Sequence, residues 1–221
     1  MDIELLFNVN EQYLQRKSYQ YGSADEPLRL RTHEMVRSPS TVVRIAMQVP
    51  NAATKYDEKF DAFLEPVRHQ PAVQAFFSLL SRIGEFSLIW HAIVWVRAIG
   101  SGHRAGQALA MSLLLGAESL IVNQGVKRLF KRSRPTTGGD ERFNVRTPIT
   151  SSFPSGHASS AFFAATILCA WSPASWAVLW FGIGVCVALS RVMVRLHHLS
   201  DIIGGAFVGT ALGIFAIVVV V

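Results

Sequence analysis

The chain has 221 residues, of which half are hydrophobic and 16% are charged, and its formal net charge is +6. Soluble chains carry about 25% charged residues on average, so this composition argues against an ordinary soluble domain. The positive charge points to anionic lipids or phosphate groups as partners. Because no zinc-finger or aromatic-basic signature is present, nucleic acid is not expected as a partner.

Residues 1–85 are polar and nearly neutral, with ten Lys and Arg against eleven Asp and Glu. The stretches from Met1 to Tyr19 and from Thr54 to Leu64 are expected to be helical. Residues 72–83 are apolar on one side, but about 12 residues are too few to cross a bilayer, which takes roughly 20. We therefore predict a polar, partly helical N-terminal region over 1–85, with an interfacial helix near 72–83.

From residue 86 onward the chain is apolar and holds eleven Lys and Arg against only four Asp and Glu. Helices satisfy their own backbone hydrogen bonds in lipid. Residues 86–221 are therefore predicted to form a membrane-embedded, all-α helical bundle with about five transmembrane helices. The second, fourth and fifth segments are long enough to cross, whereas the first and third need flanking residues. The segments are 86–99, 107–126, 158–171, 174–194 and 202–221.

Three polar blocks interrupt the apolar segments, and the predicted crossings place all of them at one face of the membrane. The blocks are Lys127 with Arg134-Pro135, then Pro154-Ser155-Gly156-His157, then Ser190-Arg191 with His197 and Asp201. Phosphoryl transfer needs cations around the phosphate oxygens and a nucleophile in line with the leaving group. Lys127, Arg134 and Arg191 can supply the cations, and the planar fork of Arg matches phosphate geometry. No metal or cofactor is expected, because no carboxylate cluster is available to hold magnesium.

The second and third blocks also supply acid-base and nucleophilic groups. His197 and Asp201 are four residues apart, which is one face of a helix. Asp201 can then accept a hydrogen bond from one ring nitrogen and leave the other as the nucleophile. His157 can protonate the leaving oxygen, Gly156 permits close backbone approach, and Ser155 can donate to a phosphate oxygen.

These blocks resemble the signature of the type 2 phosphatidic acid phosphatase superfamily. That signature is Lys, six residues, Arg-Pro; then Pro-Ser-Gly-His; then Ser-Arg, five residues, His, three residues, Asp, and every position matches within 127–201. The resemblance implies metal-independent hydrolysis of a lipid phosphate or diphosphate through a phosphohistidine. The substrate would be phosphatidate, a polyprenyl phosphate or a prenyl-linked phosphosugar. Residues 143–148 are similar to a loop of small bacterial members that act on polyprenyl phosphoribose phosphates.

Residue roles follow from the same resemblance. The implied phosphate ligands are Lys127, Arg134, Ser155, Gly156 and Arg191, and the implied catalytic residues are His157 as acid, His197 as nucleophile and Asp201 as its partner. The remaining cations of the first block, Arg128, Lys131 and Arg132, are expected to meet lipid headgroups. Integral members often have six crossings, so residues 1–85 are expected to replace the first helix.

Several alternatives stay open at this point. The same blocks fit a lipid phosphotransferase, a vanadium-dependent haloperoxidase or a non-catalytic lipid-binding scaffold. The excess of Lys and Arg on the motif face favours a cytoplasmic active face by the positive-inside rule, although many bacterial members of the family face outward. A bacterial cell membrane is the expected location. The lipid, the oligomeric state and the role of Glu118 are not specified by the sequence.

Overall fold

The regular structure of the described part of the chain consists of helices. The computed structural model describes residues 51–136, 139–148 and 150–219, which belong to the compact unit Arg44–Val221. The predicted helix from Met1 to Tyr19 lies outside these residues. The helices are α2 (Asn51–Arg68), α3 (Pro71–Ile83), α4 (Leu88–Ala98), α5 (Gly102–Leu120), α6 (Gly156–Ala170), α7 (Ala177–Met193) and α8 (Leu199–Val219).

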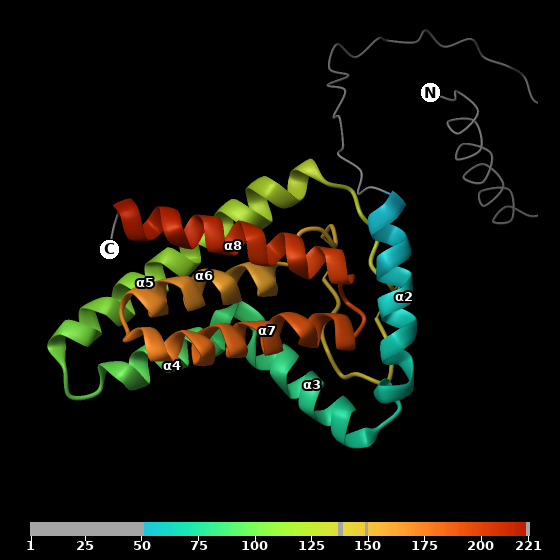
Figure 1. The fold of residues 1–221 in the computed structure, drawn as a ribbon, viewed down its shortest axis with the longest axis horizontal. Coiled ribbons are helices and arrows are strands. Elements are labelled where there is room, and N and C mark those ends of the chain that lie inside the picture. Colours follow the sequence, from blue (N-terminus) through green and yellow to red (C-terminus); the bar gives the residue numbers. More distant parts are fainter. Residues whose placement is uncertain (1–50, 137–138, 149, 220–221) are drawn as a thin grey trace, which may run out of the picture. The chain divides into compact units, whose positions relative to one another are not determined.

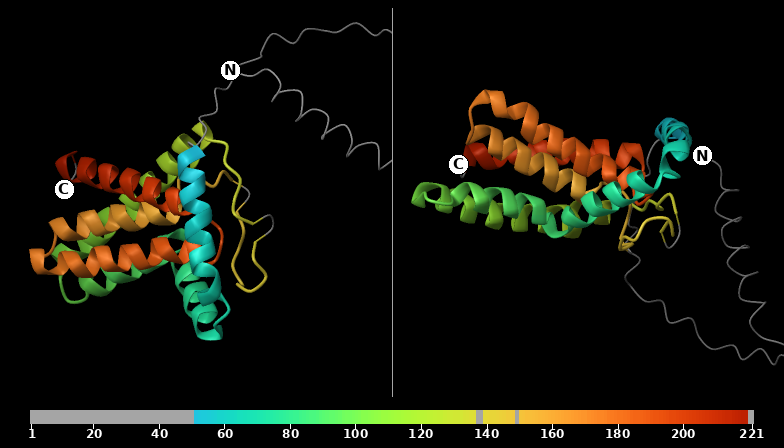
Figure 2. Two further views of the ribbon diagram at one scale, coloured as in Figure 1. Left: turned by 45° about the vertical axis from the view of Figure 1, so that its right-hand side comes forward. Right: turned by 90° about the horizontal axis from the view of Figure 1, so that it is seen from below.

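Helix α6 is the centre of the bundle and packs against both α7 and α8 (Figure 1). Helices α4 and α5 pair with each other and form a second layer beneath these three, as the view from below shows (Figure 2). Because α6 has neighbours on most sides, ten of its fifteen residues are buried. An enclosed helix is largely apolar on every side, and the buried polar residues of α6 are Ser159, Ser160 and Thr166.

The contact between α6 and α8 depends on glycine. Gly205 and Gly209 lie one turn apart on α8, and a Cβ at either position would clash with a backbone carbonyl of α6, that of Ser155 or Ser159. Small residues at such a spacing allow helix backbones to approach closely in lipid. The close approach brings Asp201, in the first turn of α8, beside the N-terminus of α6.

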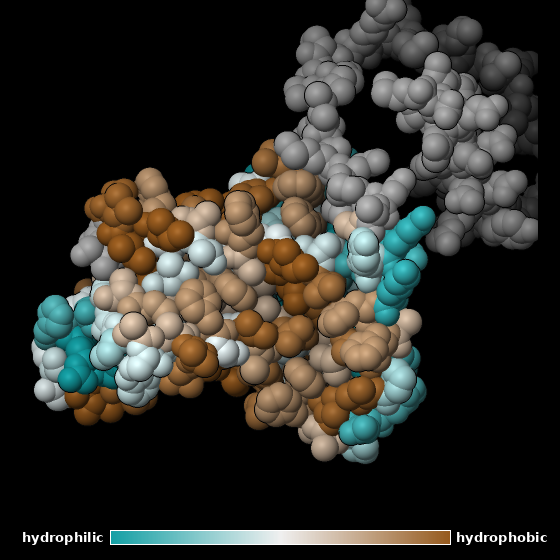
Figure 3. Space-filling model, viewed as in Figure 1, coloured by the Kyte–Doolittle hydropathy of each residue, from teal (hydrophilic) through white to brown (hydrophobic). Residues whose placement is uncertain are grey.

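The bundle has an apolar belt with polar ends. In Figure 3, hydrophobic side chains cover the middle of the bundle, and polar ones gather at the turn between α4 and α5 and on α2. Among the residues that the structure describes, three helical stretches are long and apolar enough to cross a membrane: Gly102–Leu129, Ala174–Met193 and Leu199–Val219. The bent pair of α3 and α4, which meet at 64°, counts as a fourth if it is one broken span.

All five predicted segments are therefore helical, but they differ in whether they are long enough to span a membrane. The first, α4, reaches the length of a span only together with α3, and the third, α6, has just 15 residues. The expected helix over 72–83 is confirmed as α3, which packs against α7. Its interfacial position stays a prediction, as does the boundary between an N-terminal region and a core at residue 85.

Helix α2 contains the predicted Thr54 to Leu64 stretch and crosses the end of the bundle (Figure 1). Its Arg68 side chain is fully buried and donates to the carbonyls of Met193 (3.1 Å) and Val192 (3.0 Å). These carbonyls belong to the last turn of α7, where helices leave acceptors unpaired. Arg68 therefore caps α7 and holds α2 at the turn that leads into α8.

Candidate active site

A cavity of about 340 Å³ lies where α5, α6 and α7 meet the 130–155 loop. Six of the eight predicted site residues line it: Lys127, Arg134, Gly156, His157, Arg191 and His197. The other two, Ser155 and Asp201, are buried and do not line this cavity. The three sequence blocks therefore converge on one cavity, as the predicted crossings require.

His197 lies in the turn between α7 and α8 and not on a helix, contrary to the expectation that it shares a helical face with Asp201. Helix α7 ends at Met193, and Arg195 adopts a positive φ of 55°. The amides of Leu196 and His197 both donate to the Arg191 carbonyl, at 3.0 and 3.1 Å. The tight turn folds the His197 ring back toward the first turn of α8, so the two residues still meet.

The His197 ring is oriented through its Nδ1 atom. This nitrogen lies 3.5 Å from Asp201 Oδ2 and 3.4 Å from Ser152 Oγ, which itself donates to the same carboxylate. The backbone N–H of His198 also donates to Asp201 Oδ2, at 2.8 Å. An Nδ1–H that donates to this carboxylate leaves the lone pair of Nε2 facing the cavity, as a nucleophile requires.

Burial sets the charge state of His197. The side chain is 2% exposed, and loss of solvent lowers its pKa to about 3, although the hydrogen bond from its ring to Asp201 acts in the opposite direction. Desolvation disfavours the charged form of a buried histidine. The ring is therefore neutral at neutral pH, the state in which Nε2 can attack phosphorus.

Arg134 fixes the loop next to the nucleophile. Its guanidinium donates to the carbonyls of Pro148 (3.0 Å), Thr150 (3.2 Å) and Leu196 (2.7 Å), and its Nη1 lies 3.3 Å from His197 Nε2. Burial lowers the pKa of Arg134 from its ordinary value, yet arginine stays protonated in proteins. Its positive charge is thus held next to His197 Nε2, the atom that would attack a phosphate.

Arg191 is a buried cation with few partners. It is 1% exposed, its Nη1 donates to Ser81 Oγ of α3, and its Nε has no partner within the described part of the chain. Glu85 lines the same cavity, but none of the described carboxylates forms an ion pair with Arg191. Because a buried charge without a close counter-ion is costly, Arg191 favours an anion beside it in the cavity. Ser81 gave no signal in the sequence, since it contacts the site from a segment 110 residues away.

The N-terminus of α6 forms another wall of the cavity. Gly156 begins the helix, and a Cβ there would lie 3.2 Å from Asn123 Oδ1 and 3.5 Å from Lys127 Nζ. Helix N-termini attract anions through free N–H groups and the helix dipole. Next to Gly156, His157 Nε2 is buried and lacks a hydrogen-bond partner among the described residues, so it remains available to a substrate oxygen.

Ser155 has a different surrounding from the other predicted phosphate ligands. Its hydroxyl accepts from the Ala158 N–H at 3.5 Å as the N-cap of α6, and its own N–H donates to the Asp201 carbonyl at 3.0 Å. The residue thus joins the start of α6 to the start of α8. A direct contact between its side chain and phosphate stays a prediction.

A second ion network lies behind Asp201, and the sequence did not suggest it. Arg132, expected to meet lipid headgroups, donates to Asp201 Oδ1 and pairs with Asp57 Oδ2 of α2 at 2.5 Å. Asp57 is 3% exposed and also accepts from the Ser200 N–H (2.8 Å) and Ser200 Oγ (2.7 Å). Helix α2 is therefore linked to the partner of His197 through Arg132.

Glu118 has a structural partner. Its carboxylate accepts a hydrogen bond from Ser159 Oγ of α6, and the residue lines the cavity together with Lys127. Glu118 is followed by the irregular turns Ile121–Gly125 and Val126–Leu129, which end α5, and Lys127 belongs to the second of these turns. Such interruptions of a helix are frequent at functional sites.

With this geometry in place, comparison with known proteins gives a family. The model of the PAP2 superfamily matches residues 106–221. The chain belongs to the PAP2 superfamily. It is an integral membrane protein of that superfamily and a lipid phosphatase, and the homologues named below are bacterial.

The relatives of this PAP2 phosphatase act on phosphorylated lipids. It is 31% identical to the decaprenylphosphoryl-5-phosphoribose phosphatase of Mycolicibacterium smegmatis over 62% of this chain and 73% of that one. The phosphatase of the same name in Mycobacterium tuberculosis is 30% identical, over 65% of this chain and 78% of the relative. The predicted resemblance of residues 127–201 to this family is thus confirmed.

Two solved structures share the fold. The PAP2 type phosphatidylglycerolphosphate phosphatase of Bacillus subtilis has a TM-score of 0.61 at 22% identity, over 78% of this chain and 88% of that one. LpxE of Aquifex aeolicus has a TM-score of 0.54 at 21% identity, over 67% of this chain and 87% of that one. At these identities the likeness establishes the transmembrane fold.

Proposed function

We propose that this PAP2 phosphatase removes the phosphate monoester from a polyprenyl-phosphoryl sugar phosphate through a phosphohistidine at His197. The observation that carries the mechanism is the His197 ring, whose Nδ1 faces Asp201 and whose Nε2 faces a cavity lined by Lys127, Arg134 and Arg191. The substrate class is supported by the two relatives named for decaprenylphosphoryl-5-phosphoribose.

The first half of the reaction forms the N–P bond. His197 Nε2 attacks phosphorus in line with the ester oxygen, and the P–O bond breaks as the N–P bond forms. His157 is protonated when the anionic phosphate is bound beside it, and the departing alkoxide takes this proton from its Nε2, which has no partner in the described structure. The three cations and the N–H groups of α6 stabilise the charge on the phosphoryl oxygens. Asp201 stabilises the positive charge that develops on the His197 ring.

The second half of the reaction returns the enzyme to its starting state. Water attacks the phosphohistidine, and His157, now neutral, accepts the proton from that water. The N–P bond breaks, its electron pair returns to His197 Nε2, and inorganic phosphate leaves. Each histidine thus ends the cycle in the protonation state in which it began.

Phosphate release from a panel of lipid phosphates, in detergent with a chelator present, tests this proposal. His197→Ala is the test variant, and His198→Ala is the matched control, since the His198 side chain is absent from the cavity lining. We expect release that persists with the chelator, disappears in His197→Ala and remains in His198→Ala. Equal release by wild type and His197→Ala would overturn the phosphohistidine mechanism, and the order of substrates in the panel tests the proposed lipid.

We also propose a cytoplasmic active face. The exposed cations near the site include Arg128, Lys131 and Arg146, whereas the opposite end of the bundle carries Arg97 and Arg104. Cytoplasmic loops of membrane proteins carry the excess of Lys and Arg. Labelling of single cysteines at the two ends of the bundle with a membrane-impermeant maleimide tests this orientation.

A further inference from the structure

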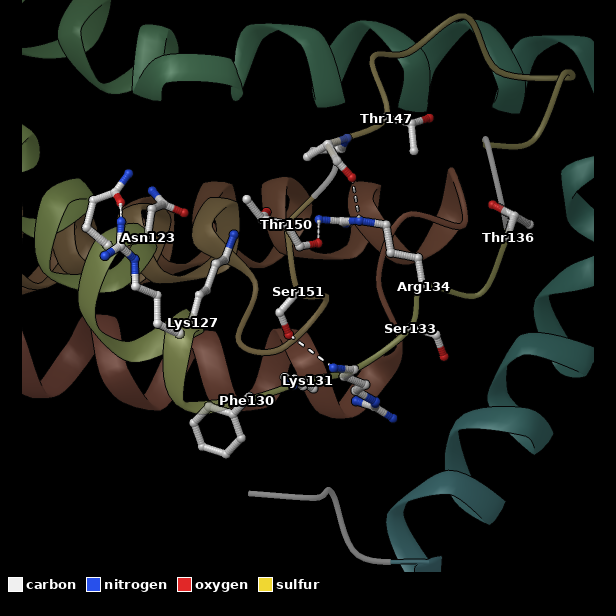
Figure 4. A pocket seen from close by; sticks show the side chains of 14 residues that line it. Asn123, Lys127, Phe130, Lys131, Ser133, Arg134, Thr136, Thr147, Thr150 and Ser151 are labelled. Atoms are coloured by element: carbon white, nitrogen blue, oxygen red, sulfur yellow. Dashed lines mark hydrogen bonds between the residues drawn. The ribbon is translucent and has the colours of Figure 1, made fainter. Parts of the chain in front are cut away.

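A basic groove of about 1020 Å³ adjoins the active-site cavity (Figure 4). The two share Asn123, Lys127, Arg134, Pro148 and Thr150, so they are continuous. In Figure 4 the side chains of Lys127 and Arg134 both extend toward Thr150, at the border between the two spaces. The groove is therefore a route out of the catalytic cavity, and a bound substrate can occupy both.

The charge of the groove is one-sided. Five Lys and Arg side chains line it, and the described residues of its wall include no Asp or Glu. Three of these cations have roles already described, since Lys127 and Arg134 line the catalytic cavity and Arg132 pairs with Asp57. The remaining two are Arg128 and Lys131.

Arg128 and Lys131 have no acidic partner in the part of the chain that the structure describes. Arg128 donates to the neutral amide of Gln124, and both cations are exposed. The rest of the wall is rich in hydroxyl and amide groups, which can hydrogen-bond to sugar hydroxyls. Such a surface suits a phosphorylated, hydroxyl-rich headgroup better than an acyl chain.

We propose that the basic groove is a second anion site, in which Arg128 and Lys131 bind the lipid-linked phosphodiester of the substrate while the phosphate monoester occupies the catalytic cavity. This inference rests on the proposed function and deepens it. The names of two compared proteins support it. Decaprenylphosphoryl-5-phosphoribose and phosphatidylglycerolphosphate, the lipids in those names, both contain a lipid-linked phosphoryl group in addition to the phosphate that is removed. The groove would thereby select lipids with two phosphates over simple lipid monophosphates.

The experiment compares kcat/KM for phosphatidylglycerolphosphate, which has both a phosphodiester and a monoester, with that for phosphatidate, which has the monoester alone. Both are measured in neutral detergent with no other anionic lipid. The test variant is Arg128→Ala with Lys131→Ala. The matched control is Lys55→Ala with Lys59→Ala, which removes two exposed positive charges from α2, outside the groove.

We expect the wild type to have the higher kcat/KM for the two-phosphate lipid. In the groove variant the ratio of the two kcat/KM values should fall roughly five- to tenfold, chiefly through KM, as for a few exposed charge contacts. The control variant should keep the wild-type ratio. Equal losses on both lipids, or a wild type that prefers phosphatidate, would overturn the second site.

Two further measurements separate the second anion site from binding of surrounding lipids and from the proposed substrate. Adding phosphatidylglycerol tests whether the groove instead binds phosphodiesters of surrounding lipids, since a defect that appears only with this lipid present would overturn the substrate role. If the wild type hydrolyses phosphatidylglycerolphosphate and not a polyprenyl-phosphoryl phosphoribose, the proposed substrate fails, while the ratio of the two glycerolipids still decides the second site.

Discussion

At the scale of single residues, His157 and His197 share one cavity but have opposite surroundings. His197 Nδ1 faces Asp201 and Ser152, and its Nε2 is next to Arg134. His157 Nε2 is buried without a partner in the described structure. A ring that is oriented by a carboxylate suits attack, and an unpartnered ring nitrogen suits proton exchange with the substrate. These roles predict different responses to the leaving group.

We expect His157→Ala to lose about 10²- to 10⁴-fold in kcat on a lipid phosphate, whose alkoxide must be protonated as it leaves. On p-nitrophenyl phosphate, whose leaving group is stable without a proton, the same variant should lose much less. His197→Ala should be inactive on both substrates, because the nucleophile itself is gone. Comparable losses of His157→Ala on the two substrates would show that His157 is not the general acid.

At the scale of elements, α2 acts on the site without entering the cavity. The Arg132 guanidinium pairs with both Asp57, at 2.5 Å, and Asp201. Arg68 caps the end of α7. The turn that carries His197 lies between these two anchors. Helix α2 therefore holds the orientation of the nucleophile from outside the three sequence blocks, and its removal would loosen the turn.

We expect Asp57→Asn to lower kcat several-fold while KM changes little. Without the Asp57 charge, Arg132 pairs with Asp201 alone, and this carboxylate becomes a weaker acceptor for the His197 Nδ1–H. The variant should also unfold at a lower temperature, because breaking a buried ion pair costs about 3–5 kcal/mol. The matched control is Glu58→Gln, an exposed acid on the same helix. A rise in KM alone would argue against a positioning role for Asp57.

The ion pairs of α2 also predict a response to acid. The hydrogen bond from Arg142 (2.7 Å) and that from Arg68 (3.0 Å) hold the pKa of Glu65 at about 2, against an ordinary value of 4.5. A carboxyl whose pKa is lowered on folding stabilises the protein above its unfolded pKa and loses this contribution as pH falls. Glu65 is partly exposed, so its contribution is small.

We therefore expect the melting temperature in detergent to fall between pH 4.5 and pH 2, with part of the fall due to Glu65. Glu65→Gln should start from a lower melting temperature at pH 6 and change less over that interval. Glu58→Gln, which lacks an ion pair among the described contacts, should follow the wild type. A Glu65→Gln curve parallel to the wild-type curve would contradict this assignment.

At the scale of the whole molecule, the sequence blocks predicted the cavity because alternating crossings return the chain to the same face. What they could not predict is the support around it. Asp57, Ser81 and Ser152 contact the site only through tertiary packing, and short polar residues in helices and loops carry no motif. One signal was available for α2, since Asp57, Asp61 and Glu65 recur every four residues and so form an acidic stripe. That stripe faces the basic residues Arg132, Arg142 and Arg195.

The conformation of the turn that carries His197 could not be predicted from the sequence pattern either. A spacing of four residues between His197 and Asp201 predicts a shared helix, but the chain turns at Arg195 (φ 55°) and begins α8 only at Leu199. The pair still meets, because the turn is closed by two hydrogen bonds to the Arg191 carbonyl. Spacing identified the partners correctly, and the conformation that joins them depends on the bundle.

The positions of the two polar ends of the bundle allow its orientation in the membrane to be tested. The end of the bundle formed by α2 and the motif blocks and the end formed by the α4–α5 turn lie on opposite sides of the apolar belt (Figure 3). The chain has two natural cysteines, Cys169 and Cys186. With both replaced by Ala, a single cysteine at Lys59 or at His103 reports on one end each, since both positions are exposed.

If the active face is cytoplasmic, a membrane-impermeant maleimide should label His103→Cys in intact cells and label Lys59→Cys only after lysis. The reason is that the excess of Lys and Arg near the motif blocks favours retention of that end in the cytoplasm. The reverse pattern would place the active site outside, and the basic groove would then attract anionic substrate without determining topology. Phosphate release by each cysteine variant verifies that the labelled protein is folded.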